Sequence, residues 1–130
     1  MPKVRPHLID KREKYKVIGR FFEIVSNLKS KKEVIDFFVG LLTPSESLMF
    51  ARRIQIAEML LEGDNYERIR KVLKVSNQTI TKTDQWLHSG DENYGRWLEK
   101  CLKVKANSKD DYSTGLDRYA HHRFLKDLLK

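Results

Sequence analysis

Apolar residues recur at intervals of three and four along most of the chain, and this spacing predicts an all-α protein without strands. A first helix is expected from a cap at Asp10 to about Leu28. Further helices are expected over residues 30–41, 43–62, 65–73, 77–88 and 94–102. Residues 103–113 are expected to form a polar linker, and residues 113–130 have the pattern of a final amphipathic helix.

Capping residues set the bounds of several of these helices. Ser30 and Glu33, and again Thr43 and Glu46, have the spacing of a capping box, and Gly63 is suited to end the long helix that Thr43 begins. The helix after Ser30 is rich in apolar residues, so we expect it to be largely buried. The first helix carries apolar residues over more than one stripe, and we expect one of its faces to meet a second subunit.

Residues 65–88 have the layout of a helix-turn-helix DNA reader, in which two short helices are joined by a tight turn. Asn65 can cap the first helix, whose inward face is expected to consist of Ile69, Val72 and Leu73. The chain must then turn at Lys74 and Val75. Ser76 can cap the second helix through the backbone N–H of the residue three positions later.

The second helix is expected to turn Ile80 and Leu87 inward, so that polar side chains occupy its opposite face. Val75 and Ile80 are spaced to pack as a hydrophobic staple, which would fix the angle between the two helices. The predicted base-reading residues are Asn77, Gln78 and Thr81, with Lys82 and Gln85 at the margin. The predicted phosphate-binding residues are Arg68, Arg70, Lys71 and Lys74. Two ordinary solvent-facing helices would carry the same residue types, and that interpretation stays open.

Positive charge is concentrated at two places in a chain of net charge +8. Residues 1–32 hold ten Lys or Arg against three acids, and residues 65–88 hold five against two, whereas residues 33–64 hold two against six. The basic N-terminal arm, residues 1–9, and the predicted reader are therefore the parts suited to a polyanion. Cations in and just after the arm could reach a groove or the DNA backbone, unless the arm is simply an exposed tail: Lys3, Arg5, Lys11 and Arg12.

Catalytic chemistry has little support in the sequence. No phosphate-binding loop, nucleophile elbow or metal-ligand spacing is present, so we expect no enzyme, no cofactor and no metal site. His121 and His122 are adjacent and would point about 100° apart on a helix, which suits surface histidines. Cys101 allows no internal disulfide because it is the single cysteine. We expect a buried, inert thiol there rather than a nucleophile assisted by His88 and Asp84.

The composition is typical of a globular domain, with 34% charged and 40% hydrophobic residues. A chain of 130 residues is expected to form one domain, small enough that a homodimer interface could supply much of its buried area. No apolar run reaches the ~18 residues of a membrane span, and the N-terminus lacks a secretory pattern. We therefore expect a soluble, cytoplasmic protein without a membrane partner.

A resemblance to the Trp repressor superfamily lies in three stretches: LLTPSESLMFARRIQIAEMLLEG, YERIRKVLKVSNQTITK and GDENYGRWLEKCL. It covers about Leu41–Leu102, and its most specific parts are LTP and the SNQTITK start of the reader. The helix order and GDENYG resemble the YerC/YecD-type branch. The resemblance implies a helical DNA-binding domain over residues 10–105, in an intertwined dimer with two reading heads. Residues 106–130, the linker and extra C-terminal helix, lie outside it.

The resemblance also implies a small-molecule pocket, where the match is weaker. Arg53 corresponds to an arginine that clamps an amino-acid ligand, and Lys82 stands where the family has a second arginine. Thr83 corresponds to a glycine that leaves room for the ligand's indole, and Trp86 to a neighbouring serine. We hypothesise that Trp86 fills the pocket from within, so that tryptophan is not needed as co-repressor. The alternative is that Trp86 is an ordinary core residue.

These observations together predict a sequence-specific, double-stranded DNA-binding transcriptional regulator, a repressor, that reads the major groove with residues 77–88. One alternative is a protein–protein adaptor that keeps the helix-turn-helix as a scaffold. Another is a nonspecific DNA or RNA binder, for which the basic arm would matter more than Asn77 and Gln78. The C-terminal helix could brace the dimer or receive a partner.

Overall fold

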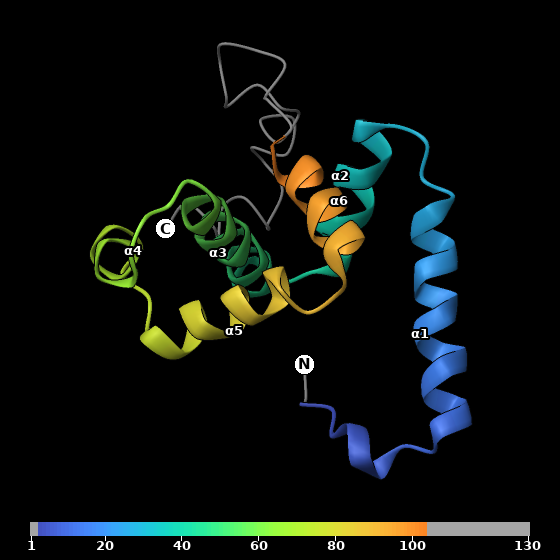
Figure 1. Ribbon diagram of the computed structural model, residues 1–130. Helices are drawn as coiled ribbons and strands as arrows, with labels where there is room; N and C mark the ends of the chain where they lie inside the picture. The colour runs from blue at the N-terminus through green and yellow to red at the C-terminus, as the bar shows by residue number, and fades with distance from the viewer. Residues whose placement is uncertain (1–2, 104–130) are drawn as a thin grey trace. The chain divides into compact units, whose positions relative to one another are not determined.

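The computed structural model describes residues 3–103, and within this range the chain forms six α-helices, one short 3-10 helix and no strand (Figure 1). The prediction of an all-helical protein is confirmed. The chain divides into two compact units, residues 1–41 and residues 42–130. The linker and helix expected over residues 106–130, with His121 and His122, lie outside the described residues.

The first unit contains a 3-10 helix, η1 (Pro6–Leu8), and the helices α1 (Lys11–Ser26) and α2 (Lys31–Leu41). Asp10 occupies the cap position of α1, but its side chain makes no capping hydrogen bond. Ser30 accepts a hydrogen bond from the Glu33 backbone N–H at 3.1 Å, as predicted. The Glu33 carboxylate accepts from the backbone N–H of Lys29 in return, one residue before the position that a capping box requires.

The first unit leaves most of its apolar side chains exposed. No residue of α1 is buried, and within α2 Val39 alone is buried. The exposed fraction is 60% for Val17 and 62% for Phe22. The prediction of a largely buried α2 is wrong, because the described residues 3–103 supply too little apolar surface to cover its flanks, and Val34 and Leu41 remain exposed. The single chain thus leaves exposed the apolar surface that a second subunit would need.

The second unit is built around the long helix α3 (Pro44–Leu61). It is followed by α4 (Tyr66–Leu73), α5 (Asn77–Leu87) and α6 (Glu92–Leu102), each of which packs against α3. The capping box at the start of α3 is complete, with Thr43 Oγ1 accepting from the Glu46 N–H at 3.1 Å and the Glu46 carboxylate accepting from the Thr43 N–H at 2.9 Å. Gly63 follows the helix with a φ of 89°, in the left-handed region that favours glycine.

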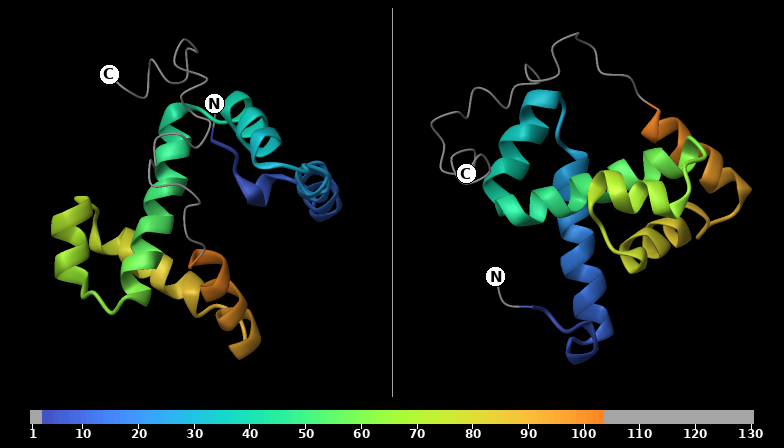
Figure 2. Two further views of the ribbon diagram at one scale, coloured as in Figure 1. Left: turned by 90° about the horizontal axis from the view of Figure 1, so that it is seen from above. Right: turned by 90° about the vertical axis from the view of Figure 1, so that its left-hand side faces the viewer.

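Two neighbouring residues of α3, Ile56 and Ala57, belong to two separate clusters of buried side chains. Ile56 packs with Ile69, Leu73 and Ile80 from α4 and α5, while Ala57 packs with Leu87 and Leu98 from α5 and α6. The first cluster holds the beginning of α5 and the second holds its end. Figure 2 shows the result, with α4 and α6 on opposite sides of α3 and α5 running between them. The position of α5 is therefore fixed at both ends by burial of apolar side chains.

Candidate nucleic-acid interface

The helices α4 and α5 have the caps that the sequence predicts. Asn65 Oδ1 accepts from the Arg68 backbone N–H at 2.8 Å, and Ser76 Oγ accepts from the Thr79 backbone N–H at 3.2 Å. Val75 packs against the cluster that contains Ile80, as the predicted staple requires. Both helices therefore begin at a side-chain cap, and the cap at Ser76 lies at the end of the short turn that joins them.

The turn depends on a residue in a conformation that the sequence did not predict. Lys74 has φ 56° and ψ 47°, and it is the one non-glycine residue with positive φ in the described range, 3–103. Its backbone N–H still donates to the carbonyl of Arg70 at 2.9 Å, so it ends α4 and reverses the chain at once. Glycine usually occupies this position, and a lysine gives no sequence signal for it.

The inward face of α4 differs from the prediction at one residue. Ile69 and Leu73 are buried, and Tyr66 packs against the same cluster, but Val72 is 55% exposed. The prediction that Val72 faces inward is wrong. The reason is helical geometry, since Val72 lies about 100° around the helix from Leu73 and so misses the stripe that the other three residues form.

The predicted base-reading residues share one property, which is that all of them are exposed on α5: Asn77, Gln78, Thr81, Lys82 and Gln85. The opposite face of α5 is buried through Ile80, Thr83 and Leu87. The buried hydroxyl of Thr83 donates to the backbone carbonyl of Thr79 at 3.0 Å, so its burial leaves no unpaired donor. The helix thus presents amides, a hydroxyl and a cation on one side and anchors itself on the other.

The predicted phosphate-binding cations fall into two pairs. Arg68 lies 3.2 Å from the carboxylate of Asp64, and Lys71 lies 3.1 Å from that of Glu67. Within the part of the chain that the structure describes, Arg70 and Lys74 form no ion pair with a carboxylate. The latter two cations are therefore the more readily available to a phosphate.

A hydrogen bond that sequence reasoning missed joins the two classes of predicted residue. The guanidinium of Arg70 donates to Oδ1 of Asn77 at 3.3 Å, across the turn between α4 and α5. A guanidinium can only donate, so the atom of Asn77 that faces it must be the amide oxygen. The amide N–H groups are then the part of Asn77 that can meet an acceptor on a base.

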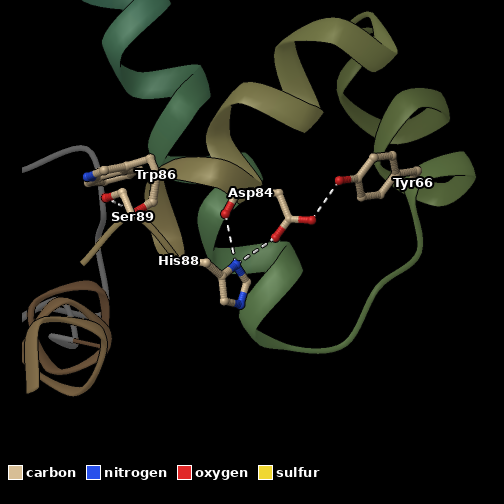
Figure 3. Close-up of polar contacts among 5 residues, drawn as sticks. All are labelled: Tyr66, Asp84, Trp86, His88 and Ser89. Atoms are coloured by element: carbon tan, nitrogen blue, oxygen red, sulfur yellow. Dashed lines mark hydrogen bonds and ion pairs between the residues drawn. The ribbon is translucent and has the colours of Figure 1, made fainter. Parts of the chain in front are cut away.

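A second set of contacts links α4 to the far half of α5 (Figure 3). The Tyr66 hydroxyl donates to Asp84 Oδ2 at 2.6 Å, and Nδ1 of His88 lies 3.2 Å from Asp84 Oδ1 and 2.9 Å from the Asp84 carbonyl oxygen. The hydrogen bond to the Asp84 carboxylate, together with burial and the negative charge, raises the pKa of Tyr66. Asp84 thus contacts both Tyr66 and His88. The buried thiol expected at Cys101 is wrong, because Cys101 is exposed.

The four residues of the expected small-molecule pocket do lie together. Arg53, Lys82, Thr83 and Trp86 line an open pocket of ≈ 630 Å³ between α3 and α5. The hypothesis that Trp86 fills this pocket is wrong, because the indole forms part of the wall and the space beside it remains. The indole N–H donates to the hydroxyl of Tyr94 at 3.1 Å, and this bond ties α5 to α6.

Within residues 3–103, no three side chains among His, Cys, Asp and Glu are grouped so that they could hold a metal ion. No helix in that range is long and apolar enough to cross a membrane.

Comparison with known proteins gives a family and two relatives. A family model described as "Trp repressor protein" matches residues 16–102, which is more than half of the 130 residues. The chain is 29% identical over 93 residues to "Uncharacterized protein YerC" of Bacillus subtilis, an alignment that covers 72% of this chain and 89% of the relative. It is also 29% identical over 96 residues to "Trp operon repressor homolog" of Aliivibrio salmonicida, covering 73% and 89%. No solved structure matches the chain significantly.

Proposed function

The chain belongs to the Trp repressor family, and from this premise we propose that it is a transcriptional regulator that binds double-stranded DNA in a sequence-specific way. The observation that carries the proposal is the two-sided character of α5. Its polar side chains are exposed along one face, while Ile80, Thr83 and Leu87 anchor the other face in the core. A helix of this kind can enter a major groove and place donors and acceptors against base edges.

The proposed roles divide the exposed residues by chemistry. Base edges require donors and acceptors at fixed positions, which suits Asn77, Gln78 and Thr81, with Lys82 and Gln85 at the margin of the contact. Arg70, through its hydrogen bond to Asn77, would leave the amide N–H groups of Asn77 to read an acceptor such as a purine N7.

The cations of α4 and of the turn between α4 and α5 are proposed to bind phosphates. Arg70 and Lys74 are proposed as the primary contacts, because neither pairs with a carboxylate in the described part of the chain. Arg68 and Lys71 would exchange their acidic partners for phosphates. The exchange costs little, because ion pairs whose cation is exposed at the surface contribute at most about 1 kcal/mol.

A homodimer is part of the proposal. The first unit exposes Val17, Ile18 and Phe22, and the second unit separately exposes Leu48 and Met49 on α3. Burial of an apolar side chain of this size contributes about 1.5–3 kcal/mol of free energy. Contact with a second copy of the chain would bury several of them and so stabilise a dimer. Helix-turn-helix dimers, of which the Trp repressor is a well-known example, bind half-sites about one DNA turn, ~34 Å, apart.

We also propose that this reading head works without free tryptophan. Support comes from the bond between Trp86 and Tyr94, which braces α5 against α6 by means of a side chain of the protein itself. Isothermal titration of the protein with tryptophan is expected to give no saturable heat. A saturable signal at micromolar tryptophan would show that the open pocket beside Trp86 takes this ligand and would end the proposal.

Selection of bound duplexes from a random pool, carried out at two salt concentrations, tests the proposed function. A sequence motif with two-fold symmetry would support both the reader and the homodimer. Salt-sensitive binding without any enriched motif would favour a nonspecific nucleic-acid binder instead. Absence of salt-sensitive DNA binding would favour the protein adaptor, and in either case the proposal fails.

A further inference from the structure

Two polar contacts join α4 to α5, and they lie at two levels of both helices. Tyr66 and Arg70 are four residues apart and therefore share a face of α4. Their partners, Asp84 and Asn77, are seven residues apart, which is two turns of α5. The bonds measure 2.6 Å for Tyr66 to Asp84 and 3.3 Å for Arg70 to Asn77. The two helices are thus connected by directional contacts in addition to their apolar packing.

The contact of Tyr66 with Asp84 is the better fixed of the two. One carboxylate oxygen of Asp84 accepts from Tyr66, and the other lies 3.2 Å from Nδ1 of His88 (Figure 3). The same Nδ1 lies 2.9 Å from the Asp84 carbonyl oxygen, and since both oxygens only accept, Nδ1 must carry the proton. The Asp84 side chain is 33% exposed, so its orientation is held on two sides and partly shielded from water.

We propose that Tyr66 and Asp84 are positioning residues that set the angle at which α5 is presented to DNA. This inference rests on the proposed function. Packing of Ile69 against Ile80 holds α4 and α5 together, but apolar contact is non-directional and permits small rotations. A short hydrogen bond to a carboxylate restricts those rotations because it requires a particular distance and angle.

The two kinds of DNA contact should differ in their dependence on this bond. A base edge is read through a fixed pattern of donors and acceptors, so a small rotation of α5 misaligns it. A phosphate accepts a cation from many geometries, so the same rotation changes phosphate binding little. Loss of the bond between Tyr66 and Asp84 is therefore expected to lower sequence discrimination more than general affinity for DNA.

The test uses the full chain with Tyr66→Phe, Asp84→Ala and both substitutions together. Fluorescence anisotropy measures binding to a duplex from the random-pool selection and to a random duplex of the same length. Each single variant is expected to lose about tenfold in affinity for the selected duplex and less than about threefold for the random one, with the salt slope unchanged. The double variant is expected to lose no more than the single ones, because both remove the same bond.

Two further variants distinguish a role in positioning α5 from a general effect on the stability of the fold. Asp84→Asn keeps an amide oxygen that can accept from Tyr66, and it is expected to recover part of the lost discrimination. Glu99→Ala removes a carboxylate that lies 2.6 Å from Nζ of Lys103, the residue that follows α6, and it is expected to leave discrimination unchanged. Equal losses on selected and random DNA, or additive losses in the double variant, would overturn the proposal.

A measurement without DNA tests the restraint on α5 whether or not a selected duplex exists. Amide hydrogen exchange in Tyr66→Phe is expected to be faster in α5 than in the wild-type chain, with α6 unaffected. Unchanged exchange in α5 would overturn the positioning role. A wild-type chain that prefers no sequence would instead remove the proposed function, while the exchange result would still decide whether this bond restrains α5.

Discussion

Replacement of Lys74 by glycine should move stability and DNA affinity in opposite directions. Lys74 holds a left-handed conformation, with φ 56° and ψ 47°, at the turn between α4 and α5. This conformation costs a residue with a Cβ atom about 1–2 kcal/mol, and glycine adopts it freely. The same residue carries a cation that we assign to a phosphate, so one substitution removes both the strain and the charge.

The expected gain in stability follows from two opposing terms. Relief of the left-handed strain contributes about 1–2 kcal/mol, and the greater freedom of glycine in the unfolded chain offsets about 0.5–1 kcal/mol of it. Lys74→Gly should therefore stabilise the protein by about 0.5–1 kcal/mol, which raises the midpoint of urea unfolding by roughly 0.5 M. The unfolding must be compared at equal chain concentration, because a dimer makes the midpoint depend on it.

Lys74→Ala is the matched control, since it removes the charge and keeps the Cβ atom. Both variants should lose the same affinity for DNA and flatten the dependence of log K on log salt by about 0.9, which corresponds to one phosphate contact. Only the glycine variant should gain stability. A glycine variant no more stable than the alanine variant would refute the account of the turn, and an unchanged salt slope in both would refute the phosphate contact.

Two more predictions concern the environment of α5. Gly90→Ala would place a Cβ atom 2.6 Å from Cδ1 of Tyr94, so Tyr94 must shift, and its hydroxyl is the acceptor for the Trp86 N–H. We expect a loss of about 1–3 kcal/mol in urea unfolding and a red shift of tryptophan emission; an unaltered spectrum would contradict this. The raised pKa of Tyr66 means that its bond to Asp84 stabilises the fold below the ordinary phenol pKa of about 10, and that this contribution is lost as pH rises through the higher folded value. Between about pH 9 and 11 the wild type should lose more stability than Tyr66→Phe, and parallel losses would argue against it.

Local chemistry made the helix bounds in the second unit predictable from the sequence. The capping box of Thr43 and Glu46 and the cap at Ser76 involve residues three positions apart, so the sequence contains both partners of each bond. The exposed polar face of α5 followed from helical periodicity in the same way. Caps and exposed helix faces depend on residues a few positions apart in the sequence and little on how the helices pack.

The features that the sequence did not predict depend on packing between helices. Tyr66 and Asp84 are 18 residues apart, and the bond between them exists because both helices rest on α3 at a particular angle. Trp86 was expected to fill the pocket between α3 and α5, but its indole N–H donates to the hydroxyl of Tyr94, eight residues away, and the indole lines the pocket instead. The burial expected of α2 failed for a related reason, because burial depends on the surface available to cover it and not on the apolar content of the helix alone.

In the proposed function α5 reads bases while the cations beside it hold the DNA backbone, and the variants Gln78→Ala and Lys74→Ala separate these two roles. Both variants are titrated against the selected duplex, its single-base variants and random DNA. Gln78→Ala is expected to reduce the preference at one base pair by about 1–3 kcal/mol with an unchanged salt slope, whereas Lys74→Ala is expected to weaken binding to every duplex alike and to lower the slope by about one. Equal losses for both variants on selected and random DNA would contradict it.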